Sequence, residues 1–209
     1  MRMLVSQPGV TYIDQPLGHT HFNPWHNRLP RPVLNTFVSI RKGEDSRNLQ
    51  AYFEAILSGR LRVNSQWKLF DPSYSFVVNQ LVIKCVNGPP IMDWFMDHLD
   101  VKPIFFVRHP VPTALSIMNW KWGNSAEAFL QDEGFCSEWL GAEKERFCRK
   151  ILSHGSLLEQ FVLEICLCNI KALGVARERG VFTLSYEELL MRPKEVSELI
   201  CEKIGLFMS

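Results

Sequence analysis

The sequence lacks a surplus of charge of either sign and lacks a long hydrophobic run. Lysine and arginine total 23 residues against 22 aspartates and glutamates, so the formal net charge is +1. Proteins that bind nucleic acid through its phosphates usually carry a clear basic surplus, and this composition gives that class no support. Apolar stretches also stay well below the about 20 residues that span a bilayer. We therefore expect no nucleic-acid partner and no membrane partner.

The six cysteines lack the spacing of a metal or redox motif, because none of them lies in a C-x-x-C pair. Cys166 and Cys168 stand two positions apart in a predicted helix, which places them on different faces of that helix. The N-terminal residues carry no secretory signal. These observations predict free, reduced thiols and a cytoplasmic protein.

A single globular domain accounts for the whole length of the chain. The 209 residues are 46% hydrophobic and 22% charged, which are ordinary values for a folded domain. A chain of this size buries a substantial core. No internal repeat, low-complexity tract or linker divides it, so we predict one domain over residues 1–209.

The most informative segment is residues 103–116, PIFFVRHPVPTALS. Its apolar run Ile104–Val107 is typical of a strand buried on both faces of a parallel sheet. Arg108 follows that run, and Pro110 suits the first turn of a helix that we expect to reach about Trp120. A cation at a strand end, next to the free N–H groups of a helix, makes a site for an anion such as phosphate.

The rest of the chain alternates between helical and strand patterns, which indicates an α/β fold with a parallel sheet flanked by helices. Ser156 and Glu159 form a capping box ahead of an apolar helix that we expect to reach Leu173. Residues 1–40 contain five prolines and are expected to be mostly loop. The other expected elements are helices at 48–58, 91–99, within 125–150 and from 193 onward, and strands at 81–86 and 181–186.

These segments resemble, in the same order, sulfotransferases that use PAPS (3'-phosphoadenosine 5'-phosphosulfate), with the closest likeness to bacterial and carbohydrate-type members. Arg108 and Ser116, eight positions apart on a strand–Arg–x-Pro–helix frame, look like the family's 3'-phosphate-binding motif. Leu184–Leu190 (LSYEELL) resembles its Tyr-Glu-Asp-Leu strand, and Gln7–Pro16 (QPGVTYIDQP) resembles a segment usually reading His-Pro-x-Val…Glu-Pro. The likeness also takes in the strand and helix expected before the arginine, and so extends over nearly the whole chain.

The resemblance implies a P-loop NTPase-like sulfotransferase fold and transfer of a sulfuryl group from PAPS to a hydroxyl or amine acceptor, with carbohydrate as one candidate. It implies that Arg108 and Ser116 bind the 3'-phosphate of PAPS, the co-substrate, and that Tyr186 lies near the nucleotide. No metal is expected. The residues alone also allow a plainer interpretation, in which Arg108 caps a carbonyl, Ser116 bonds within its own helix and Tyr186 packs in the core.

One part of the family pattern has no counterpart here. These enzymes normally begin with a strand and a Gly/Ser/Thr-rich loop that holds the 5'-phosphosulfate, and neither that segment nor a G-x-x-x-x-G-K-[ST] loop occurs in this sequence. We therefore expect an N-terminally incomplete sulfotransferase-like domain, with the first strand and phosphate loop missing and an unpaired sheet edge available for oligomerisation. The alternative is a catalytically inactive, shortened relative that acts as a binding or partner module. An unrelated P-loop kinase or NTPase is a third hypothesis, which the absence of a Walker lysine disfavours.

The resemblance does not identify a catalytic base. The glutamate that carbohydrate-type relatives use matches Gln15, whose amide cannot accept the proton, and the histidine of cytosolic relatives matches Val86. His19 and His21 lie nearby in the sequence and are the candidates for a replacement base. A His-x-His pattern also occurs at metal sites, although loop histidines without that role are commoner. Residues 120–122 (WKW) follow the phosphate helix, where the family shapes its acceptor pocket.

Overall fold

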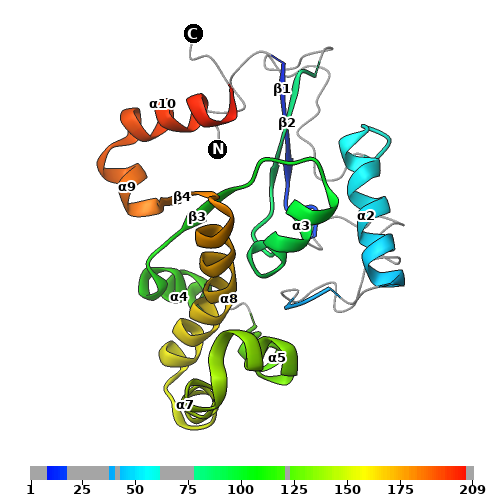
Figure 1. Ribbon diagram of the computed structural model, residues 1–209. Coiled ribbons are helices and arrows are strands. Elements are labelled where there is room, and N and C mark those ends of the chain that lie inside the picture. The colour runs from blue at the N-terminus through cyan, green and yellow to red at the C-terminus, as the bar shows by residue number, and fades with distance from the viewer. Residues whose placement is uncertain (1–8, 18–37, 41–42, 62–77, 121–122, 206–209) are drawn as a thin grey trace.

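Figure 1 shows a computed structural model of the chain, which describes residues 9–17, 38–40, 43–61, 78–120 and 123–205. Within these ranges the protein is α/β, mostly helical, with short parallel strands. The strands are β1 (Val10–Asp14), β2 (Gln80–Lys84), β3 (Ile104–Val107) and β4 (Phe182–Ser185). The longer helices are α2 (Glu44–Leu57), α4 (Pro110–Asn119), α7 (Gly141–His154), α8 (Leu157–Arg179) and α10 (Pro193–Ile204). The shorter ones are the 3-10 turn η2 (Pro89–Ile91), α3 (Met92–His98), α5 (Ala126–Gln131), α6 (Glu133–Phe135), the π-helical turn η3 (Cys136–Leu140) and α9 (Tyr186–Met191).

The four described strands form two separate parallel pairs, β1–β2 and β3–β4, and not one continuous sheet. The prediction of a parallel sheet flanked by helices is therefore confirmed only in its coarser part. The registers run from Val10↔Gln80 to Asp14↔Lys84 in the first pair and from Ile104↔Phe182 to Val107↔Ser185 in the second. Strand β1 lies in a region that the sequence led us to expect as mostly loop. Its five residues, VTYID, are rich in β-branched and aromatic side chains, but prolines stand close on both sides.

Helix α2 covers the β1–β2 pair. Its buried face, which includes Tyr52 and Phe53, packs against Ile13 of β1 and against the partly buried Leu81 and Ile83 of β2. The Tyr52 hydroxyl also donates a hydrogen bond to the carbonyl oxygen of Pro16, just beyond β1. This helix begins four residues before the predicted start. The segment from Glu44 is compatible with a helix but makes no apolar pattern, so the periodicity did not indicate this first turn.

Helix α8 is the central element of the rest of the fold. The predicted capping box is confirmed: the Ser156 hydroxyl accepts from the backbone N–H of Glu159, whose carboxylate accepts from the backbone N–H of Ser156. The helix continues beyond the predicted Leu173 to Arg179, where Gly180 ends it in a left-handed conformation with φ 65°. Figure 1 shows α4 beside α8 and α5 and α7 around its N-terminal half.

Three groups of buried residues surround α8. Near its start, Phe161 and Ile165 pack against Ala114 of α4. Along its middle, Leu163 and Leu167 join a cluster with side chains from α5 to α7. Near its end, Ala172, Val175 and Ala176 pack against Met92 and Phe105. Among the described helices, none is long and apolar enough to cross a membrane.

Candidate anion site at the ends of strands β3 and β4

The carboxyl ends of β3 and β4 lie at the same edge because the two strands are parallel and end together, at the pair Val107↔Ser185. The residue that follows β3 is therefore Arg108, and the residue that follows β4 is Tyr186. The Cζ atom of Arg108 lies 4.8 Å from the centroid of the Tyr186 ring, which is a cation–π contact. The structure thus brings together two of the three residues that the sequence analysis assigned to nucleotide binding.

Arg108 keeps an unused donor in this position. Its side chain is half-buried, and its Nε atom is buried without a hydrogen-bond partner among the described residues. An unpaired buried donor costs about 1–3 kcal/mol, and more when the group is charged. A ligand that accepts a hydrogen bond there would recover that free energy. An arginine guanidinium carries a positive charge, so the matching ligand is an anion.

Helix α4 begins directly beside Arg108. Its N-cap residue, His109, accepts a hydrogen bond at Nδ1 from the backbone N–H of Val111, at 3.3 Å. The Thr113 hydroxyl donates to the His109 carbonyl oxygen at 2.9 Å. Pro110 occupies the first helical position, as predicted, where its missing N–H is not needed. The ten-residue helix therefore points the positive end of its dipole towards the ends of the two strands.

Glu187 links the two strand ends through its carboxylate. Its Oε1 accepts a hydrogen bond from the backbone N–H of His109 at 3.0 Å. This hydrogen bond holds the pKa of the Glu187 carboxyl below its ordinary value, and the nearby charge of Arg108 adds to the effect. The Glu187 side chain is half-buried, and its hydrogen bond holds the backbone between β3 and α4 in place.

Among the described residues, no hydrogen bond joins Ser116 to Arg108 or Tyr186. It is half-buried on α4, two residues beyond Ala114, and a step of two residues turns it away from the face of α4 that packs on α8. Within the described part of the chain, its hydroxyl has no hydrogen bond to Arg108 or to another residue. The pairing of Arg108 with Ser116 therefore stays a prediction.

Gln15, which the sequence resemblance set against a catalytic glutamate, joins the ends of β1 and β2. Its Oε1 accepts a hydrogen bond from the backbone N–H of Val86 at 3.2 Å, and its own N–H donates to the carbonyl oxygen of Lys84 at 2.8 Å. Gln15 has φ 52° and is the one non-glycine residue with positive φ in the described ranges. The side chain of Lys84 forms an ion pair with Asp14 at 3.0 Å. The Gln15 side chain therefore connects two strands, and its amide cannot act as a base.

The remaining candidate site residues either lie outside the described residues or form no cluster. His19 and His21, the candidates for a base, lie outside the described residues, as do Lys121 and Trp122. Trp120 ends α4 with 72% of its surface exposed, so it is not a core residue. In the part of the chain that the structure describes, no group of three His, Cys, Asp or Glu side chains is arranged to hold a metal ion.

The cysteines offer no reactive thiol at this site. All six are free. Burial raises the pKa of Cys85 and of Cys168 to about 12, so both thiols are protonated at neutral pH. A protonated thiol is a poor nucleophile and a poor metal ligand. We therefore assign these two cysteines to packing.

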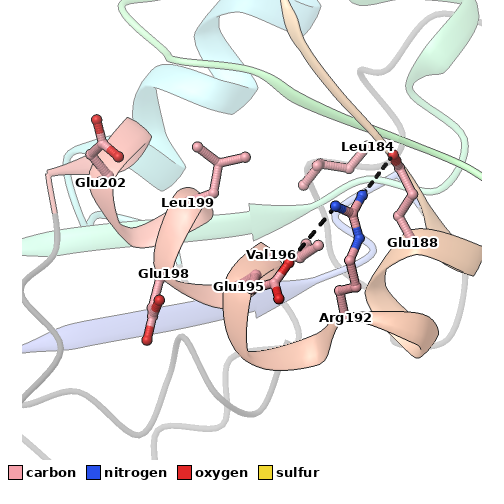
Figure 2. Close-up of a pocket in the computed structure, with 8 residues that line it drawn as sticks. All are labelled: Leu184, Glu188, Arg192, Glu195, Val196, Glu198, Leu199 and Glu202. Carbon is pink, nitrogen blue, oxygen red and sulfur yellow. Dashed lines mark ion pairs between the residues drawn. The ribbon is translucent and has the colours of Figure 1, made fainter.

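A hollow of about 410 Å³ lies between α9 and α10, and Figure 2 shows the residues that line it. Arg192 lies inside it between Glu188 and Glu195, at 3.5 Å and 3.7 Å from their carboxylate oxygens. The lining also includes Glu198 and Glu202, and no other cation. The excess of carboxylates makes this hollow unsuitable for a phosphate. Its lining does not include Arg108, Ser116 or Tyr186.

Comparison of the chain with protein-family models, with curated proteins and with solved structures finds no significant match. The candidate site is therefore defined by its own geometry, namely a cation held against an aromatic ring where two parallel strands end and a helix begins.

Proposed function

We propose that the ends of β3 and β4 bind the 3'-phosphate of an adenosine nucleotide, and that the chain is a sulfotransferase-type protein acting with PAPS on a hydroxyl or amine acceptor. The observation that carries the proposal is the placement of Arg108: its guanidinium lies on the Tyr186 ring and its Nε is buried without a partner among the described residues. The P-loop-like fold of that family belongs to the same proposal.

The chemistry of the pair suits a phosphate. A guanidinium presents several N–H donors in a fixed plane, which matches the oxygens of a phosphate group. The Tyr186 ring limits the rotation of the Arg108 side chain, so less conformational entropy is lost when a ligand binds. The first turn of α4 adds only the positive end of its dipole, because the N–H groups of His109 and Val111 are already bonded and Pro110 has none. In the proposed reaction these residues bind and orient the nucleotide, while PAPS supplies the sulfuryl group.

Affinity for the nucleotide should be modest for this chain. The sequence contains no Gly/Ser/Thr-rich loop that would hold a 5'-phosphosulfate. Such a loop offers several charge-assisted hydrogen bonds, each worth about 1.5–3 kcal/mol. Without three of them, the binding free energy falls by about 5 kcal/mol, which is more than a thousandfold in affinity.

Calorimetric titration with adenosine 3',5'-bisphosphate and with adenosine 5'-monophosphate tests the proposal. We expect the bisphosphate to bind more tightly, because only it carries the 3'-phosphate. Arg108→Ala should weaken bisphosphate binding by about 1.5–3 kcal/mol, or about ten- to a hundredfold. Arg146→Ala, at an exposed arginine on α7 without an ion pair among the described residues, is the matched control and should leave the dissociation constant unchanged. Equal affinity for the two nucleotides, or an Arg108→Ala variant that binds normally, contradicts the site.

A second candidate is a binding or partner module without catalysis. The observation in its favour is Gln15, whose amide stands where carbohydrate-type relatives place the base and is engaged with the backbone of Val86. This candidate predicts nucleotide binding without turnover. Transfer of radiolabelled sulfate from PAPS to any hydroxyl or amine acceptor by the purified chain would eliminate it.

A further inference from the structure

Helix α7 exposes an aromatic side chain between two cations. Phe147 is 63% exposed, whereas its neighbour Cys148 is 6% exposed and packs against α8. Lys144 and Lys150 lie three positions before and after Phe147, on the same face of the helix. Both lysines are exposed and form no ion pair within the described ranges, and Glu143 is the one carboxylate on this face. We call Lys144, Phe147 and Lys150 the α7 surface.

The hollow between α9 and α10 has the opposite charge. It is lined by Leu184, Val196 and Leu199, by four glutamates and by Arg192. Leu199 is 38% exposed, so part of the apolar lining is open to a partner. Arg192 lies between two of the glutamates, and Lys194 lies 4.0 Å from a third. The fourth, Glu202, forms no ion pair in the described part of the chain. An excess of negative charge therefore remains around an apolar surface.

The α7 surface and the hollow of one chain are too far apart to meet. Helix α7 packs on the N-terminal half of α8, whereas α9 follows β4, which begins beyond the C-terminal end of α8. Helix α8 has 23 residues and is therefore about 35 Å long. Figure 1 shows α7 at one end of the molecule and α10 towards the other. Only the hollow of another molecule can receive the α7 surface.

We propose that the α7 surface of one copy of this chain docks into the hollow of a second copy, with Phe147 against Leu199 and the two lysines among the carboxylates. The second copy is the occupant because the chain itself presents what the hollow lacks, an exposed apolar side chain flanked by cations. Burial of a large aromatic side chain supplies the main attraction, and the opposite charges fix the orientation. This inference does not depend on the nucleotide site.

The proposed contact is head-to-tail, because it joins two different surfaces. Each added copy leaves one α7 surface and one hollow free, so assembly continues past a dimer until a ring closes or the chain concentration limits it. One aromatic side chain and a few charges make a small interface, so the association should be weak. It should also weaken with salt, because the screening length falls from about 10 Å at 0.1 M to about 3 Å at 1 M salt.

Sedimentation velocity of the full chain at about 0.01–1 mM tests the proposal, and we expect the average mass to rise with concentration. Phe147→Glu brings a carboxylate against the acidic hollow, and Leu199→Glu buries one beneath the phenylalanine ring. Each variant alone should associate at least about tenfold more weakly than the wild type. Val86→Glu, at a valine that is 47% exposed just after β2, is the matched control and should associate as the wild type does. Circular dichroism checks that all three variants fold.

A mixture of Phe147→Glu and Leu199→Glu chains separates this proposal from other kinds of association. The first variant retains an intact hollow and the second an intact α7 surface, so the mixture contains one functional contact. We expect it to form dimers and nothing larger. A wild type that stays monomeric, a variant that associates as the wild type does, a mixture that stays monomeric or grows beyond dimers, or association unaffected by 1 M salt overturns the proposal.

Discussion

The helices around α8 and the two strand pairs differ in how completely they cover their apolar residues. In the first region Phe129 of α5 has no exposed surface and Leu167 of α8 almost none. In the second region every residue of β2 is partly exposed, and so is Phe106 of β3. A helix satisfies its own backbone, whereas a strand needs neighbours at both edges. Within the described residues, the strand region therefore contains apolar side chains that its neighbouring elements cover only in part.

Replacing a phenylalanine in each region should give the largest contrast. We expect Phe129→Ala to lower the free energy of unfolding by about 3–5 kcal/mol, because it empties a fully buried position. Phe106→Ala, at an exposed strand edge, should cost about 1 kcal/mol or less. Urea unfolding followed by circular dichroism measures both. Similar losses for the two variants would show that the regions are packed alike.

The tightest approach in the helical region lies between Gly174 of α8 and Trp139. A Cβ atom on Gly174 would lie 2.2 Å from Cζ3 of the Trp139 ring, so the ring or the helix must move. We expect Gly174→Ala to destabilise the fold by about 1–3 kcal/mol, even though alanine favours a helix more than glycine does. Gly123→Ala is the control, because its Cβ would meet no atom within 4 Å. A stabilised Gly174→Ala protein would mean that the packing around α8 is loose.

The two regions each contain a capping box, at Ser156 of α8 and at Ser185 of α9. Ser156→Ala should lower the global free energy of unfolding by about 1 kcal/mol, because α8 contacts most of the core. Ser185→Ala should have a smaller global effect, because α9 has no buried residue. Hydrogen exchange should instead report faster opening of residues 186–191 alone. A larger global loss from Ser185→Ala would reverse the comparison.

The smallest difference that we predict between the two regions is in how the glutamates of the two capping boxes affect stability at acidic pH. The side-chain hydrogen bond from Ser156 lowers the pKa of Glu159, and the backbone hydrogen bond from Ser185 lowers that of Glu188, both from an ordinary value of 4.5. A carboxyl whose pKa is lower in the folded state stabilises that state above about pH 4.5, and this contribution is lost as pH falls through the folded value. Both side chains are exposed, so the contributions are small.

Stability measured against pH for Glu159→Gln and Glu188→Gln tests this difference. The Glu159→Gln protein should lose less stability than the wild type as pH falls below about 4.5, because it no longer carries that carboxyl. The Glu188→Gln curve should follow the wild type closely, since α9 contributes little to global unfolding. A Glu159→Gln curve with the same slope as the wild type would contradict the assignment.

Local signals in the sequence predicted individual elements well. The apolar run Ile104–Val107 is strand β3, and Pro110 begins α4, as expected. The capping box at Ser156 marks the start of α8. Strand β1 was missed, because five residues between prolines give a weak pattern and their partner β2 is distant in the chain. The division of the strands into two pairs was not predicted either, because hydrogen bonding between strands depends on which edges meet.

The candidate site was predictable only in its parts. Arg108 was chosen from its position after an apolar run and Tyr186 from the resemblance to the sulfotransferase motif, and the parallel pairing of β3 with β4 brings them into contact. The role of Gln15 as a connector between β1 and β2, and the particular partner of the Glu187 carboxylate, could not be seen in the sequence. Each depends on a hydrogen bond to a backbone group far away in the chain.

The sequence by itself determined where strand β3 and the helices after it begin, because caps, prolines and apolar runs act within a few residues. Only the tertiary structure decided that the four described strands form two pairs and that an arginine lies on a tyrosine ring. The physical reason is the separation along the chain over which each interaction acts. Helix signals are satisfied within one turn, whereas strand pairing and the placement of a charge depend on groups that folding brings together from distant parts of the chain.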